Sequence, residues 1–91
     1  PKAKIVLVKI WTDGTAKIPY DNAIDKIAEH FRLPVINPFD DVFFNSSLYL
    51  DNMVSGHPTA MGYACMGLAM ERLFSKCVVE NANYFKYATI G

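Results

Sequence analysis

The 91-residue chain is long enough for one small domain with a modest core, so we treat residues 1–91 as a single unit. Nine Lys and Arg residues balance nine Asp and Glu residues. The chain therefore has no basic stripe for a nucleic acid, and we expect no nucleic-acid partner. Because no apolar run approaches the roughly 20 residues of a transmembrane helix, we also expect no membrane span.

The first half of the sequence predicts two strands joined by a helix. Residues 4–10 are β-branched and almost continuously apolar, which is typical of a parallel strand covered on both faces. Residues 20–31 predict a helix, capped by Asp21 or Asn22, and residues 33–38 a short strand that ends at Pro38. This is a βαβ unit, whose crossover should be right-handed. The apolar face of the helix consists of Ala23, Ile24, Ile27, Ala28 and Phe31.

A long connection and a long helix follow. Residues 39–56 exceed the usual length of a connection, which indicates a functional loop or a short hidden element. Thr59 can cap a helix that runs to about Glu80. Its small residues would let another element approach closely: Gly62, Ala64, Gly67 and Ala69. Its predicted buried stripe is Tyr63, Met66, Met70, Leu73, Phe74 and Cys77.

The predicted sheet has only two strands, and such a sheet has unpaired edges and is not independently stable. Either the chain is part of a larger α/β domain, which we favour, or several copies associate through the exposed sheet edge. Trp11 lies at the carboxyl end of the first strand, where open α/β sheets bind ligands. It either caps the core or lines a substrate site.

The residues before the long helix contain the most specific chemical signal. His57 lies in a Gly-His-Pro turn directly before the capping residue Thr59, which places it on a rigid, exposed corner. A histidine in this position can act as a general base, and Asp51 is a carboxylate that could orient it. The alternatives are a turn histidine that only bonds the backbone and an Asp that only forms an Asx turn.

The segment His57-Pro58-Thr59-x-x-Gly62-Tyr63 resembles the last motif block of the SGNH (GDSL-type) esterases and acylhydrolases. The resemblance implies a three-layer α/β/α, flavodoxin-like fold, of which residues 1–91 would be the C-terminal part. It also implies that His57 is the base that activates a serine near the start of the full domain. No cofactor or metal is implied.

The acid of the catalytic triad does not transfer directly from this resemblance. The family places the acid three residues before the histidine, and that position is Val54 here. A short insertion would bring Asp51 to the imidazole. Otherwise Asp40, Asp41 or a backbone carbonyl would orient His57.

No nucleophile or metal site is evident in the sequence. The serines Ser46, Ser47, Ser55 and Ser75 lack a Gly-x-Ser-x-Gly elbow, so we expect no activity from this chain alone. The only other candidate ligands, His30, Cys65 and Cys77, do not have metal-binding spacing. The two cysteines would lie roughly 18 Å apart on one helix, too far for a disulfide.

The sequence thus predicts the base-bearing part of a serine ester hydrolase that acts on an ester-bearing small molecule or an acylated carbohydrate. Two alternatives remain. One is a non-catalytic α/β interaction module that completes its sheet by oligomerisation, and the other is a ligand-binding descendant of such hydrolases. The compartment stays open, with a secreted or periplasmic location among the alternatives.

Overall fold

The computed structural model describes residues 3–12, 14–54 and 57–86, and it confirms the βαβ unit. Strand β1 (Leu7–Val8) and strand β2 (Val35–Ile36) are parallel and are joined by helix α1 (Ile18–Phe31). The apolar run at residues 4–10 thus forms a regular ladder over a short stretch only. Two backbone bonds flank it, from Leu7 N–H to the Pro34 carbonyl at 3.0 Å and from Lys9 N–H to the Ile36 carbonyl at 2.9 Å.

Helix α1 begins two residues earlier than predicted, because Pro19 has a backbone angle that suits a first helical turn. Asp21, predicted as a cap, instead accepts a hydrogen bond from the Ile10 N–H at 3.0 Å and so ties the helix to the end of β1. The helix ends at Phe31, and the next residue, Arg32, has a left-handed φ of 55°. This conformation turns the chain back toward β2.

The long connection contains short hidden elements, as one of the two alternatives predicted. Two 3₁₀ helices, η1 (Pro38–Asp40) and η2 (Val42–Asn45), precede helix α2 (Ser47–Asp51). The Asn37 side chain accepts from the Phe39 N–H of η1, and the Asp41 side chain accepts from the Phe43 N–H of η2. Strand β3 (Met53–Val54) then pairs antiparallel with strand β4 (His57–Pro58).

Helix α3 (Ala60–Glu80) has the predicted cap and the predicted end. The Thr59 hydroxyl accepts from the Gly62 N–H at 3.1 Å, and Asn81 separates the helix from the short α4 (Ala82–Phe85). The predicted buried stripe is partly wrong, since Tyr63 is 59% and Phe74 49% exposed. Leu73 and Cys77 are buried as predicted. The rest of the buried face consists of the small residues Gly62 and Ala69, which were predicted to allow close approach.

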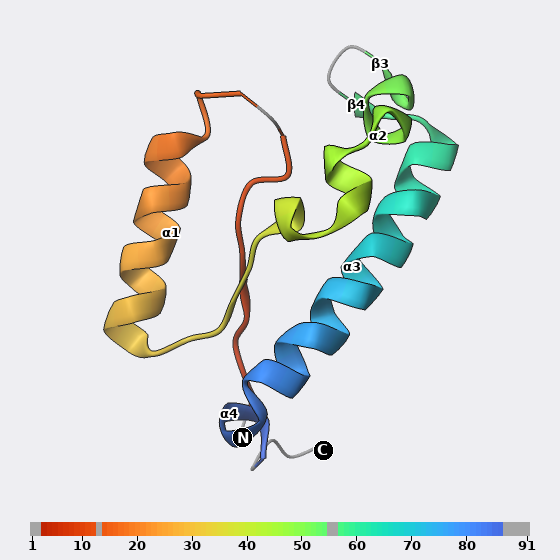
Figure 1. Cartoon of the computed structure of the whole chain (residues 1–91). Coiled ribbons are helices and arrows are strands. Elements are labelled where there is room, and N and C mark those ends of the chain that lie inside the picture. The colour runs from red at the N-terminus through yellow and green to blue at the C-terminus, as the bar shows by residue number, and fades with distance from the viewer. Residues whose placement is uncertain (1–2, 13, 55–56, 87–91) are drawn as a thin grey trace.

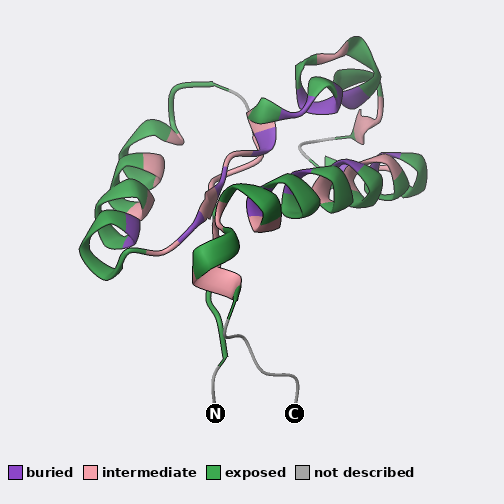
Figure 2. Ribbon diagram, turned by 60° about the horizontal axis from the view of Figure 1, so that its bottom comes forward, coloured by how far each residue is buried: buried purple, intermediate pink, exposed green. Residues whose placement is uncertain are grey.

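The described residues form a mixed α/β structure in which helices lie on both sides of the parallel strands. Figure 1 shows α1 on one side of β1 and β2 and α3 on the other. The core lies on the α3 side, and Figure 2 shows buried residues along the strands, the segment after β2 and the inner face of α3. No helix within the described ranges is long and apolar enough to span a membrane. The core residues are Ile36, Phe43, Phe44, Tyr49, Ala69, Leu73 and Cys77.

Candidate functional site

His57 lies at the start of β4, in the short hairpin before α3. In this hairpin Val54 is opposite His57, and Met53 is opposite Pro58. Because successive side chains of a strand point to opposite faces, the buried Pro58 leaves His57 on the exposed face. The turn residues 55–56, which include the candidate nucleophile Ser55, lie outside the described residues.

Contacts between Asn52 and the start of α3 fix the corner that carries His57. The Asn52 carbonyl accepts from the Thr59 N–H at 2.7 Å, and the Asn52 Oδ1 accepts from the Thr59 hydroxyl at 3.1 Å. A Cβ added to Gly62 would lie 2.8 Å from the Asn52 carbonyl oxygen, so only glycine fits without a shift. The backbone around His57 is therefore held on both sides, at Asn52 and at Thr59.

Asp51 is the last residue of α2 and precedes Asn52, so it belongs to the same corner as His57. Its side chain is exposed. Within the described residues no hydrogen bond or ion pair joins its carboxylate to the His57 imidazole. The structure thus places both predicted residues on one exposed corner and shows no bond between them.

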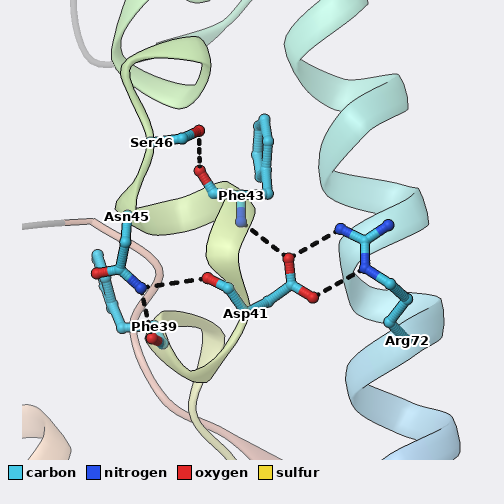
Figure 3. Close-up of polar contacts among 6 residues, drawn as sticks. All are labelled: Phe39, Asp41, Phe43, Asn45, Ser46 and Arg72. Carbon is cyan, nitrogen blue, oxygen red and sulfur yellow. Dashed lines mark hydrogen bonds and ion pairs between the residues drawn. The ribbon is translucent and has the colours of Figure 1, made fainter.

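Asp41, an alternative acid, is occupied by other partners. Arg72 of α3 donates to it twice, from Nε at 2.9 Å and from Nη2 at 2.8 Å, and the Phe43 N–H donates at 3.0 Å (Figure 3). The hydrogen bond from Arg72 lowers the pKa of Asp41 most, and the Phe43 N–H lowers it further, whereas burial acts in the opposite direction. Asp41 therefore connects η2 to α3. Asp40, its neighbour, is exposed.

The described serines and cysteines show no catalytic pairing. The Ser46 hydroxyl donates to the Phe43 carbonyl at 2.6 Å, and Ser47 and Ser75 are exposed. Cys65 and Cys77 are free thiols, and burial raises the pKa of Cys77. The described part of the chain holds no cluster of three or more His, Cys, Asp or Glu residues suited to a metal ion.

One contact that the sequence did not reveal links helix α2 to the residues after β1. The Tyr49 hydroxyl donates to the Trp11 carbonyl at 2.9 Å, and Trp11 packs against the core, as the capping alternative predicted. The aromatic-rich composition of residues 39–49 was the available signal for it. Figure 1 shows that the hairpin β3–β4 lies on the side toward which β1 and β2 both run. Ligands of open α/β sheets bind beyond these carboxyl ends.

No protein-family model, curated protein or solved structure matches this chain. Assignment of a function therefore depends on the geometry of the corner around His57. That geometry combines an exposed histidine, an exposed aspartate at the end of α2 and a backbone held by hydrogen bonds between Asn52 and Thr59.

Proposed function

We propose that this chain supplies the general-base histidine of an SGNH-type serine ester hydrolase, and that His57 is this base. The observation that carries the proposal is the position of His57. It is exposed, it directly precedes a capped helix, and its corner lies on the carboxyl-end side of two parallel strands.

The layer order supports the finer fold that the proposal needs. A parallel pair of strands with α1 on one side and α3 on the other has the helix–sheet–helix order of a three-layer α/β/α fold. In the proposed enzyme, β1 and β2 are two strands of a larger flavodoxin-like sheet. The long helix α3 then covers one face, and the His57 corner opens at the end of the sheet.

In the proposed reaction, the neutral His57 imidazole takes the proton of a serine hydroxyl as the serine oxygen attacks the ester carbonyl carbon. The bond to the leaving alcohol breaks, and the imidazolium returns the proton to that alcohol. Water then releases the acyl group by the same route. Asp51 would accept the second ring N–H of His57 and fix its tautomer. The serine comes from outside the described residues, and the substrate is an ester-bearing small molecule or an acylated carbohydrate.

A specific observation also favours a second candidate function, a non-catalytic interaction module. An open apolar groove lies beside the two-stranded sheet, and it is lined by Ile5, Leu7, Ile27, Phe31 and Leu33. Such a surface is typical of a region that associates with another protein. In this alternative, copies of the chain complete one another's sheets, and His57 has no chemical role.

The test is hydrolysis of nitrophenyl acetate by the natural protein that carries this sequence. His57→Ala should reduce kcat/KM at least about a hundredfold, the scale expected for a general base. His30→Ala is the matched control, because His30 is the other histidine of the chain and is also exposed, although it lies on helix α1. It should change the rate less than about twofold.

A second pair of variants tests the acid. Asp51→Asn should lower kcat and leave KM nearly unchanged, whereas Asp40→Asn, also an exposed carboxylate, should change neither. Circular dichroism would confirm that each variant is folded. Full activity in His57→Ala, or an inactive natural protein, would overturn the hydrolase proposal.

A further inference from the structure

Helix α3 has more apolar surface than the core covers. From Ala60 to Met70, about three turns, no residue is charged. Within these turns the buried residues, Gly62 and Ala69, lie on one face of the helix. A helix that is apolar all round is typically covered on more than one face. Much of the apolar surface of these turns is therefore left uncovered.

The uncovered surface includes a continuous face of α3 opposite the buried Ala69, which we call the outer face. Each residue turns a helix by about 100°, so its members lie within about 60° of the direction opposite Ala69. The large rings on it, Tyr63 and Phe74, are 59% and 49% exposed. Figure 2 shows most of α3 in the colour of exposed residues. The outer face consists of exposed residues at helical spacing: Ala60, Tyr63, Ala64, Gly67, Glu71 and Phe74.

Two polar groups of the outer face have no partner in the described part of the chain. No hydrogen bond or ion pair reaches the Tyr63 hydroxyl or the Glu71 carboxylate there. Glu71 is the only charged residue of the outer face. A phenol hydroxyl donates and a carboxylate accepts, so the two groups complement each other.

A second copy of α3 fits the outer face when it runs antiparallel. A two-fold axis at Gly67 places each residue before Gly67 level with the residue equally far after Gly67 in the other copy. Tyr63 then lies level with Glu71 of the second copy, so its hydroxyl can donate to that carboxylate. Ala60 lies level with Phe74, so a small side chain meets a ring. The two Gly67 residues meet at the axis, where the absence of side chains lets the helices approach closely.

We propose that two copies of this chain associate through the outer faces of α3, antiparallel and crossing at Gly67. Charge selects this register. A parallel pair, or an antiparallel pair centred on Glu71, would place two carboxylates opposite each other. A lipid surface is disfavoured as the occupant, because the outer face carries a carboxylate and no Lys or Arg. The association uses neither a sheet edge nor catalysis, so it goes beyond both functions considered above.

The first test is sedimentation equilibrium of the natural protein. A pair of helices forms less than a standard interface, so we expect a monomer–dimer equilibrium with a Kd in the micromolar range. Gly67→Glu should raise this Kd at least about tenfold, because two carboxylates would meet at the axis. The variant should fold, since nothing in its own chain lies within 4 Å of the added Cβ.

Val79→Glu is the matched control. Val79 is an apolar residue of the same helix and is 76% exposed, but it lies outside the outer face. This substitution should change the Kd less than about twofold. A natural protein that stays monomeric at about 100 µM would overturn the proposal. So would a dimer that Gly67→Glu leaves intact, because that dimer would use another surface, such as a sheet edge.

Disulfide cross-linking tests the register. Gly67→Cys should form a disulfide between copies, because the two positions meet at the axis. Ser75→Cys is the control, since Ser75 follows Gly67 by eight residues and the two copies of it would lie roughly 24 Å apart along the axis. The wild type gives the background from the free thiols Cys65 and Cys77. A covalent dimer of Ser75→Cys, or none of Gly67→Cys, would overturn the proposed register.

The variant Gly67→Glu also separates this inference from the hydrolase proposal. In the proposed pair the two helices begin roughly 20 Å apart along the axis, so the two His57 corners lie at opposite ends. Hydrolysis per chain should therefore be unchanged in monomeric Gly67→Glu. An inactive natural protein that dimerises in this register would reject the enzyme and support the helix pair. An active natural protein that stays monomeric would do the reverse.

Discussion

The two long helices, α3 and α1, both cover the small parallel sheet, but α3 buries more of its residues than α1 does. Along α3, Ala69 is completely buried, and Leu73 and Cys77 are nearly so. Along α1, only Ala28 is buried, while Ile27 and Phe31 are 48% and 64% exposed. A helix is about 10 Å across and two paired strands lie about 4.8 Å apart, so a two-stranded sheet is too narrow to cover a full helix face.

The difference arises from what surrounds each helix. Helix α3 packs on β2 and also on η1 and η2, which widen the surface available to it. Helix α1 packs mainly on β1, and a salt bridge joins its Asp25 to Lys9. Local sequence can therefore specify a helix correctly even where few residues pack against it.

The largest expected difference in stability is between truncating a large apolar side chain of α3 and truncating one of α1. Leu73→Ala should lower the free energy of unfolding by about 2–5 kcal/mol, because it leaves a cavity in the core. Phe31→Ala, although it removes more atoms, should cost less than about 0.5 kcal/mol in the structure described, since its ring is exposed. Urea unfolding measures both. A Phe31→Ala cost as large as that of Leu73→Ala would show that the α1 side is packed in the natural protein.

A smaller effect is expected from the ion pair that connects η2 to α3. Asp41→Asn should cost about 1.5–3 kcal/mol at neutral pH, because charge-assisted hydrogen bonds are lost. Asp40→Asn, one residue away and exposed, should be nearly neutral.

The pH dependence of this loss follows from the lowered pKa of Asp41. The folded pKa lies below the unfolded value of 3.8, so the contribution is fully present above that value. It disappears as the pH falls through the folded pKa. The difference in unfolding free energy between the wild type and Asp41→Asn should therefore shrink below about pH 4. A difference that stayed constant down to about pH 2 would contradict a stabilising carboxylate.

The smallest expected change in stability comes from replacing either of two glycines of α3 by alanine. Gly62→Ala should cost about 1–3 kcal/mol, because its Cβ would meet the Asn52 carbonyl oxygen. Gly67→Ala should stabilise by about 0.5–1 kcal/mol, because nothing lies within 4 Å of the added carbon and alanine favours a helix. Melting temperatures of the two variants check the sign. Equal shifts would show that the contact of Gly62 with Asn52 is not maintained in solution.

The sequence predicted the elements that local chemistry determines. The Thr59 cap and the end of α3 near Glu80 were confirmed, because each depends on neighbouring residues. The strand predicted at residues 4–10 was confirmed only at Leu7–Val8. The parallel pairing also followed, since a strand, a helix and a strand at this spacing have few alternatives.

The parts that the sequence did not predict depend on distant contacts. Tyr63 and Phe74 fit a helical stripe, but the close approach at Gly62 and Ala69 turned α3 toward its smaller residues. Asp21 does not cap α1, because the helix begins at Ile18 and Asp21 lies within its first turn, where its carboxylate accepts from the Ile10 N–H. The pairing of Asp41 with Arg72 joins residues far apart in the chain, and no local pattern encodes it. The roles of His57 and Asp51 stay predictions, with both residues on one corner.

The length of helix α3 also determines how the residues at its two ends are oriented around the helix axis. At one end Thr59 and Gly62 hold the corner of His57, and beyond the other end Tyr84 holds the backbone of Ile5. The 21 residues between Ala60 and Glu80 span about 30 Å as a single rod, and each residue turns that rod by about 100°. Deleting one residue from its middle would rotate the imidazole a quarter-turn or more around the helix axis relative to the start of β1. The length of α3, counted in residues, therefore sets the direction in which His57 faces.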